Sequence, residues 1–281
     1  MINRLRIYSS IAFFMQFFMI INMGIQIGSL FLPYYGLLIV TGIAVASIVG
    51  IIQTKIFKLD VNDFIIVAAL GGLGGFLGAK LLYIIVSFSK IDWSRITDPD
   101  YLEAILKGGF VFYGGLIGGL LLLLLSKKLF KIDAARYLAV CMPCLPIVHA
   151  FGRIGCSLAG CCYGMPYDGP FAITYHNSIV APKDIPLFPV QLTEAVCNLI
   201  IAAVLLIYIH KNKDKSFYSL PLYLFMYAPV RFILELLRYD SAERGSFLFL
   251  STSQWISIGL VAVAALLTLF IKHKAYNNTA Q

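Results

Sequence analysis

Residues 149 to 164 read His-Ala-Phe-Gly-Arg-Ile-Gly-Cys-Ser-Leu-Ala-Gly-Cys-Cys-Tyr-Gly, and long apolar runs lie on both sides of them. This mixture is unfavourable for a helix that faces lipid and is typical of a site. Two more polar insertions interrupt apolar surroundings, Gln191 with Glu194 and Arg231 with Glu235. A charge at bilayer depth costs about 3 kcal/mol or more, so charged residues there tend to face an interior cavity. We therefore expect the three stretches to meet.

The composition indicates a helical membrane protein. The 281 residues are 60% hydrophobic and 13% charged, and several apolar runs can cross a bilayer core of about 30 Å. Runs such as residues 116–125 do not alternate as the strands of a membrane barrel do. The net charge of +8 comes mostly from Lys and Arg at the ends of apolar runs, which indicates anionic-lipid contact and no nucleic-acid partner. The predicted fold is an all-α, polytopic integral membrane helical bundle.

Eight apolar runs follow one another along the chain. They cover residues 11–32, 35–52, 64–86, 108–127, about 134 into the central stretch, 192–209, 220–237 and 256–271. The first is an uncleaved span or a helix lying at the interface, because no convincing cleavage site ends it. We expect seven core transmembrane helices plus an extra N-terminal hydrophobic helix. The predicted division is an N-terminal segment 1–33, a transmembrane domain 34–274 with a short outward-facing segment at about 156–188, and a cytoplasmic tail 275–281.

The lysine clusters predict the orientation. They lie at residues 55–58, 127–131, 211–215 and 272–274, all on one side if each run crosses once. The positive-inside rule puts this side in the cytoplasm. The site should then face the outer side of the membrane.

Two glycine-rich stretches lie in the third and fourth runs, at residues 71–78 and 108–119. Glycines four residues apart share a helix face and predict close helix packing rather than a phosphate loop. Lys80 either extends outward or contacts a lipid headgroup. Tyr113 is either an interfacial aromatic residue or a hydrogen-bonding group in the cavity.

Arg153 lies between Gly152 and Gly155 in the central stretch. Its guanidinium is a planar fork of donors that suits a phosphate. The alternative is an internal ion pair with Glu194 or Glu235. Both arrangements can hold in turn, with the carboxylate as the partner when the site is empty.

A second charged group lies at the end of the seventh run. Arg231, Glu235 and Arg238 follow at i, i+4 and i+7, which on a helix makes one charged stripe. The surplus positive charge favours an anion site. Gln191 and Glu194 begin the sixth run and are expected in the same outer layer.

The six cysteines leave several interpretations open. Cys141 and Cys144 have a metal or redox spacing but should be buried small residues inside a span. Cys156, Cys161 and Cys162 could bind a metal or supply a thiol nucleophile. A disulfide from Cys156 to one of the other two is favoured on the oxidising outer side.

The chain resembles the prolipoprotein diacylglyceryl transferases of bacterial inner membranes, over roughly residues 35–274. Several separate motifs match in one order. They are Tyr35-Gly36-Leu37, Gly108-Gly109, Gly114-Gly115-Leu116-Ile117-Gly118, Gly152-Arg153 with Gly155 and Gly164, Pro189 with Gln191 and Glu194, Arg231-Phe232 with Glu235 and Arg238, and Gln254.

The resemblance implies a transferase of lipoprotein biosynthesis. It would move the diacylglyceryl group of phosphatidylglycerol to the lipobox cysteine of a prolipoprotein signal peptide, release glycerol phosphate, and use no cofactor or metal. Arg153 and Arg231 would be central, and the thiol proton could go to Glu194, Glu235, Tyr113 or His149. The substrate-binding candidates are Tyr35, Gly114, Gly115, Gly155, Cys156, Gln191 and Arg238.

The chain departs from the family pattern at several positions. Cys156 stands in place of the usual Asn, and Cys161 in place of a Glu. Ala159 replaces a second Asn, Tyr113 replaces a His, and Phe188 begins a motif that usually begins with His. A different acceptor, a membrane thiol protein and a lipid-binding protein without chemistry are therefore alternatives.

Overall fold

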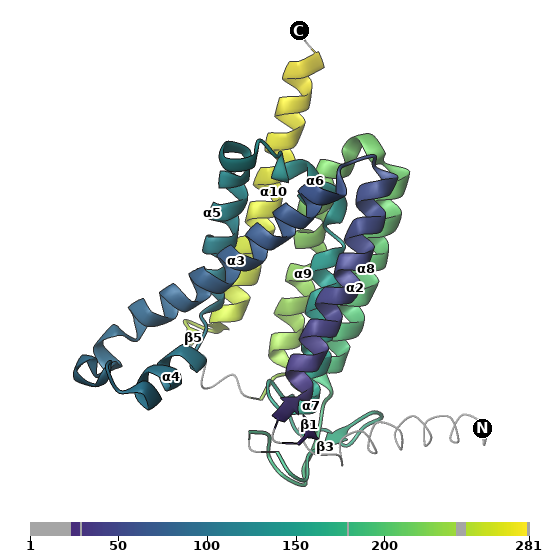
Figure 1. Ribbon diagram of the computed structural model, residues 1–281. Helices are drawn as coiled ribbons and strands as arrows, with labels where there is room; N and C mark the ends of the chain where they lie inside the picture. The colour runs from purple at the N-terminus through teal and green to yellow at the C-terminus, as the bar shows by residue number, and fades with distance from the viewer. Residues whose placement is uncertain (1–23, 29, 179, 240–245, 280–281) are drawn as a thin grey trace. The chain divides into compact units, whose positions relative to one another are not determined.

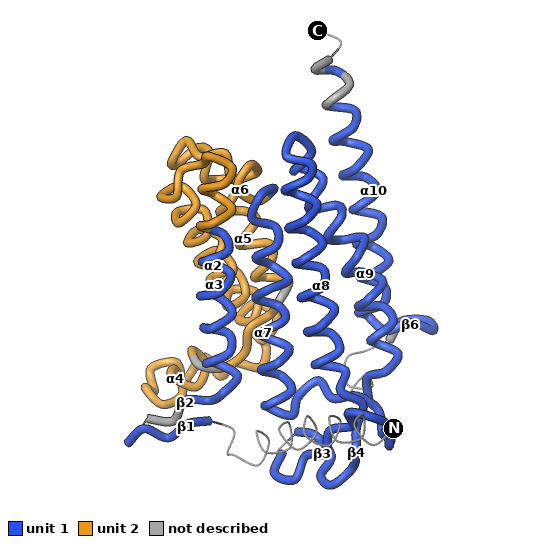
Figure 2. The backbone as a smooth tube through the Cα atoms, turned by 90° about the vertical axis from the view of Figure 1, so that its right-hand side faces the viewer, with its two compact units in different colours: residues 1–50, 139–281 blue, residues 51–138 orange. Residues whose placement is uncertain are grey.

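The computed structural model describes residues 24–28, 30–178, 180–239 and 246–279. These residues belong to two compact units, residues 1–50 with 139–281 (unit 1) and residues 51–138 (unit 2), coloured separately in Figure 2. The helices, labelled in Figure 1, are α2 (Tyr34–Ile56), α3 (Val61–Val86), α4 (Pro99–Lys107), α5 (Phe112–Phe130), α6 (Ala134–Cys141), α7 (Cys144–Ala159), α8 (Val190–Lys211), α9 (Ser219–Leu236) and α10 (Thr252–Thr279). Three 3-10 helices are η1 (Phe88–Lys90), η2 (Trp93–Arg95) and η3 (Lys213–Tyr218).

The predicted spans from residue 35 onward are confirmed as helices. Six described helices are long and apolar enough to cross a membrane, and the bent pair α6 and α7 makes a seventh if it counts as one span. Pro143 lies at the break between them and cannot donate the backbone hydrogen bond of a continuous helix. The all-α, multi-pass fold class therefore holds.

The N-terminal segment differs from the predicted helix where it is described. From residue 24 it forms a hairpin of β1 (Gly24–Ile27) and β2 (Leu30–Pro33), with Gly24 opposite Pro33. Gly28, in the turn, has φ +60°, a conformation that glycine adopts without strain. The rest of the predicted N-terminal helix, residues 1–23, lies outside the described residues.

Helices α7, α8, α9 and α10 of unit 1 pack in sequence order, each against the next (Figure 2). One buried apolar cluster contains Leu205 of α8, Tyr223 of α9 and Met142, which lies between α6 and α7. A second cluster joins Ala46 of α2 to Ile147 of α7. The exposed faces of these helices are also apolar, as expected for helices that face lipid.

The segment between α7 and α8 has a small core of its own. Its strands β3 (Ile173–Thr174) and β4 (Pro186–Leu187) pair antiparallel. Ile173, Tyr175, Ala181 and Leu187 are buried together in it. A third short pair, β5 (Ser246–Phe247) with β6 (Leu250–Ser251), precedes α10. The short outward segment of the prediction is therefore compactly folded.

The glycines of unit 2 let α3 and α5 touch backbone to backbone. A Cβ added at Gly78 would collide with the carbonyl oxygen of Gly114, and one added at Gly74 with that of Gly118. Gly72, on another face of α3, has open space around it. The predicted close packing is thus confirmed, and it accounts for the glycine spacing.

Lys80 of α3 has a different role from the two predicted for it. Its Nζ donates to the carbonyl oxygens of Ile105 and Gly108, each at 2.5 Å, at the end of α4. The ammonium also lies over the rings of Tyr83 and Phe110. A lysine at a helix C-terminus satisfies carbonyls that have no partner within the helix. Lys80 therefore fixes α4 to α3 inside unit 2.

Candidate functional site

One carboxylate lies at the centre of the site in unit 1. Glu194 of α8 is 1% exposed, and two arginines from other helices reach it. Arg153 Nη2 is 3.0 Å from Glu194 Oε1, and Arg231 Nη1 is 3.9 Å from Glu194 Oε2. Charges this deeply buried are tolerated when each has a partner. The three predicted stretches therefore do meet, with Glu194 between the two arginines.

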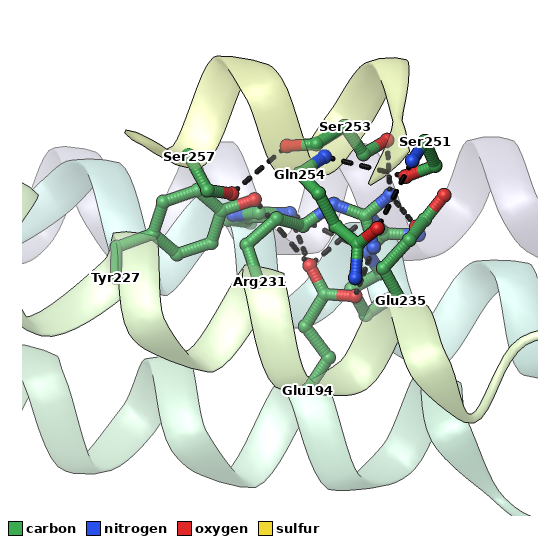
Figure 3. Close-up of polar contacts among 10 residues, drawn as sticks. Glu194, Tyr227, Arg231, Glu235, Ser251, Ser253, Gln254 and Ser257 are labelled. Atoms are coloured by element: carbon green, nitrogen blue, oxygen red, sulfur yellow. Dashed lines mark hydrogen bonds and ion pairs between the residues drawn. The ribbon is translucent and has the colours of Figure 1, made fainter. Parts of the chain in front are cut away.

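Arg231 also binds Glu235 and Ser253 (Figure 3). Its Nη2 is 2.6 Å from Glu235 Oε2 and donates to Ser253 Oγ at 3.0 Å. Ser253 lies in the first turn of α10, so one guanidinium connects α8, α9 and α10. Two arginines and two glutamates sum to no net charge, so the network is balanced when it holds no ligand.

The Nε2 atom of His149, on α7, lies close to both Arg153 and Glu194, and it cannot form a hydrogen bond with both at the same time. Arg153 Nε donates to His149 Nε2 at 3.3 Å, which requires Nε2 without a proton. The same Nε2 is 3.4 Å from Glu194 Oε1, where a hydrogen bond requires a proton on Nε2. The His149 side chain is 26% exposed, against 1% for Glu194. Which of the two contacts is a hydrogen bond therefore depends on whether Nε2 carries a ring proton.

Helical spacing places these groups on common faces. His149 and Arg153 are four residues apart on α7, and Tyr227, Arg231 and Glu235 follow at the same spacing on α9. Residues four apart lie one above the other on a helix. Each helix thus directs its polar side chains to the site while its other faces stay apolar.

Four buried side-chain atoms have no hydrogen-bond partner within the described ranges. They are Asn198 Oδ1, Arg231 Nη1, Glu235 Oε1 and Gln254 Nε2. Buried polar atoms are normally paired, so such exceptions call for an explanation. Arg231 Nη1 and Gln254 Nε2 are donors, and Asn198 Oδ1 and Glu235 Oε1 are acceptors. A ligand that carries both acceptor and donor oxygens would satisfy them.

Gln191 connects the start of α8 to the end of α7. Its Nε2 donates to Cys161 O at 2.9 Å and to Tyr175 Oη at 3.4 Å. Tyr175 Oη in turn donates to Ser157 O at 2.9 Å. Burial raises the pKa of Tyr175 to about 12, so the phenol stays a hydrogen-bond donor at neutral pH. The sequence predicted Gln191 as a substrate-binding residue, and in the structure its amide positions the loop after Arg153.

Three of the cysteines gather beside this loop. The Sγ atoms of Cys156, Cys161 and Cys162 all lie within 4.8 Å of one another. All three are thiols, so the favoured disulfide is not formed in this structure. Hydrogen bonds with Cys156 and Cys161, together with the charges of Arg238 and Arg153, hold the pKa of the Cys162 thiol below its ordinary value.

Cys141 and Cys144 are partly buried at the break between α6 and α7, whereas the sequence predicted buried residues inside a span. Cys144 Sγ donates to Ala46 O at 3.1 Å, and Cys141 Sγ to Gly50 O at 3.7 Å. Both carbonyls belong to α2, so the two thiols hold α2 against the α6–α7 break.

The remaining predicted residues are placed as follows. Tyr35 packs on Gly155, where an added Cβ would lie 3.0 Å from the tyrosine ring. Arg238 lies beyond the end of α9, so the predicted helical stripe ends at Glu235. Arg238 is buried, and its backbone forms an antiparallel bridge with Gly164. Tyr113 belongs to unit 2 and is exposed.

Gly114 and Gly115 also belong to unit 2, where they pack against α3. Backbone contact therefore explains both glycines. Their predicted part in substrate binding stays a prediction, as does that of Tyr113.

Two further groups escaped the sequence analysis. Tyr227 Oη is 3.5 Å from Glu194 Oε1, and Ser253 accepts from Arg231. Tyr227 lies four residues before Arg231, a spacing that could have identified it. Ser253 had no comparable signal, because its partner is far away in the sequence.

Fold and site together define a class: a multi-pass membrane protein with a buried arginine and glutamate network suited to an anionic ligand. Within that class, the chain belongs to the prolipoprotein diacylglyceryl transferase family. A sequence model described as "Prolipoprotein diacylglyceryl transferase" matches residues 22–270. The resemblance found in the motifs is therefore confirmed over most of the chain.

Several bacterial proteins with the name phosphatidylglycerol–prolipoprotein diacylglyceryl transferase are similar to the chain. One from Clostridium tetani is 38% identical over 229 residues, which are 82% of this chain and 89% of the relative. One from Clostridium perfringens, whose name ends in the numeral 2, is 33% identical over 270 residues, which are 92% of this chain and 100% of the relative. One from Methylococcus capsulatus is 30% identical over 248 residues, 85% of this chain and 88% of the relative.

Proposed function

We propose that the chain is a transferase that moves the diacylglyceryl group of phosphatidylglycerol to the lipobox cysteine thiol of a prolipoprotein. Its family and the names of its relatives support both substrates. The observation that carries the assignment of the site is that two arginines, the partly buried Arg153 and the buried Arg231, share the carboxylate of Glu194. Two guanidinium groups in one layer suit the phosphate of the donor lipid.

The donor headgroup matches the unpaired atoms of the site. Its phosphate oxygens can accept from Arg231 Nη1 and Gln254 Nε2, and its glycerol hydroxyls can donate to Glu235 Oε1. A zwitterionic headgroup with an ammonium in place of the hydroxyls would add a third positive charge beside the two arginines. The site therefore favours phosphatidylglycerol over such lipids.

The reaction is a substitution at a glycerol carbon. The acceptor sulfur forms a bond to the carbon that carries the phosphate, and the carbon–oxygen bond breaks with its electron pair on the leaving oxygen. Glycerol phosphate thus leaves with one more negative charge than the diester phosphate had. Arg153 and Arg231 stabilise this charge as it develops, in a site away from bulk water.

The thiol proton goes to His149. Glu194 and Glu235 are almost fully buried, and both carboxylates are already bound to arginines. His149 is more exposed, and its Nε2 can hold a proton toward Glu194. Imidazole is the side chain that most readily gains and loses a proton near neutral pH. Among the four predicted acceptors of the proton, this geometry favours His149.

The site faces the outer side of the bacterial plasma membrane. In unit 1 the lysines of residues 211–215 lie at the C-terminal end of α8, and those of residues 272–274 lie within the C-terminal part of α10. Glu194 lies near the start of α8 and Ser253 at the start of α10, toward the opposite end. The positive-inside rule puts the lysines in the cytoplasm, so the site opens outward. Donor lipid reaches it from the bilayer.

Lipidation of a peptide tests this function. The purified protein in phosphatidylglycerol vesicles should add one diacylglyceryl mass to a lipobox peptide and release an equal amount of glycerol phosphate. A matched peptide with serine in place of the lipobox cysteine should stay unmodified. Binding of phosphatidylglycerol without any release would contradict the transferase and favour a lipid-binding protein without chemistry.

A further inference from the structure

We propose that Cys156, Cys161 and Cys162 form a binding site for a thiophilic divalent metal ion, and that Zn²⁺ is the ion that fits it. The relatives' names say nothing of a metal, and the transfer reaction does not require one. The site can therefore be tested whether or not the chain lipidates a peptide.

The three sulfur atoms already converge. They lie within 4.8 Å of one another. Zinc–sulfur bonds are about 2.3 Å long, which puts neighbouring sulfurs of a tetrahedral site about 3.8 Å apart. The sulfur atoms therefore lie within about 1 Å of the spacing of a tetrahedral site.

An unusual turn of the backbone produces this convergence. Cys156 lies in the last turn of α7, which ends at Ala159. Gly160 has φ +67° and Cys162 has φ +60°, both in the left-handed region. Cys161 N donates back to Cys156 O at 3.1 Å and tightens the turn. A left-handed backbone is unfavourable for a residue with a Cβ, and such residues cluster at functional sites. Here it brings the third thiol to the other two.

Groups from outside the turn hold it in place. Gln191 Nε2 donates to Cys161 O at 2.9 Å. Tyr175 Oη donates to Ser157 O, one residue after Cys156, at 2.9 Å. Both partners are buried. Ligands that are oriented by outer groups lose less freedom when they bind a metal.

The chemistry of the donors selects the ion. Thiolates favour Zn²⁺ and other soft ions over Mg²⁺ and Ca²⁺, which prefer oxygen. The three thiols are only partly buried, so a water molecule can take the fourth position of a tetrahedral ion. Each thiol loses its proton to the solvent, and the complex of three thiolates with Zn²⁺ has one net negative charge. Arg153, three residues before Cys156 on α7, supplies a nearby positive charge.

A titration with Cd²⁺ tests the site, because cadmium thiolates have a near-ultraviolet charge-transfer band. The full-length protein, purified in detergent with reductant and then stripped of metal, should bind one Cd²⁺ per chain. Zn²⁺ should abolish the band by competition. Loss of an outer-shell partner costs about 10- to 100-fold in metal affinity, so loss of a ligand in Cys161→Ser should cost more than about 100-fold. Cys197→Ser, on α8 and outside the cluster, should bind like the unmutated protein.

A second measurement needs no variant and so does not depend on a variant folding. In the unmutated protein Zn²⁺ should protect the three thiols from a maleimide, and a chelator should restore labelling. The site is overturned if no charge-transfer band forms, or if the band persists when all three cysteines are serine. It is equally overturned if peptide mass spectra of the isolated protein show Cys156 cross-linked to Cys161 or Cys162.

Discussion

Arg153 and Arg231, from two different helices, approach the two oxygens of one carboxylate, at 3.0 Å and 3.9 Å from Glu194. The buried glutamate keeps two positive charges close together that would otherwise repel each other. It thereby prepares a pair of guanidinium groups for a phosphate.

Replacing Glu194 with glutamine should destabilise the protein without lipid. Removing one partner of a buried ion pair typically costs about 3–5 kcal/mol, because the other charges stay buried. Phosphatidylglycerol should recover part of this loss, since its phosphate supplies a new negative charge. Thermal unfolding in detergent, with and without the lipid, measures both effects. Asp168→Asn, at an exposed position, is the control and should change little. An unaltered unfolding temperature in Glu194→Gln would contradict the role of Glu194.

Arg231→Lys should be far more damaging than Ser253→Ala. The lysine keeps the charge but loses the fork that reaches both Glu194 and Glu235. Loss of one group that stabilises developing charge typically costs about 100-fold or more in rate. Ser253→Ala removes one hydrogen bond, worth about 1 kcal/mol or roughly fivefold. Initial rates of peptide lipidation compare the two. Equal rates would show that the fork of Arg231 is not needed.

His149→Asn should slow lipidation by about 100- to 10,000-fold, the usual contribution of a general base. Binding of phosphatidylglycerol should stay close to that of the unmutated protein. His273→Gln, at an exposed position in α10, is the control and should keep the unmutated rate. A His149→Asn variant that lipidates the peptide at the unmutated rate would assign the proton to another group.

Gly78→Ala and Gly72→Ala should act in opposite directions on stability. The first places a methyl group against the backbone of Gly114, and overpacking of this kind costs about 1–3 kcal/mol. The second meets open space and should stabilise α3 by about 0.5–1 kcal/mol, since alanine favours a helix over glycine. Thermal unfolding of the two variants in detergent tests the packing of α3 on α5. Similar unfolding temperatures would contradict it.

The class of the protein and the order of its spans could be predicted because they depend on strong physical signals. Apolar length identifies a span, and a charge inside a span must face the interior. These two rules were enough to predict that Arg153, Glu194 and Arg231 lie together. They could not say which arginine atoms reach which carboxylate oxygen, because that depends on how the helices pack.

The features that were missed depend on local backbone or on distant partners. Arg238 fits a helical stripe by spacing, but α9 ends before it. The hairpin at Gly24–Pro33 is as apolar as a helix would be, so composition could not separate them. Lys80 binds carbonyls at the end of α4, a partner that no pattern in α3 reveals. The turn at Cys162 likewise appears first in the structure.

Release of glycerol phosphate from phosphatidylglycerol, measured with a lipobox peptide and followed together with the peptide's mass, shows whether the two arginines hold the donor phosphate. The unmutated protein should release glycerol phosphate in step with peptide lipidation. The Arg153→Ala and Arg231→Ala substitutions should each lower this rate by at least about 100-fold. Full release by either variant would contradict the claim that the two arginines around Glu194 hold the donor phosphate.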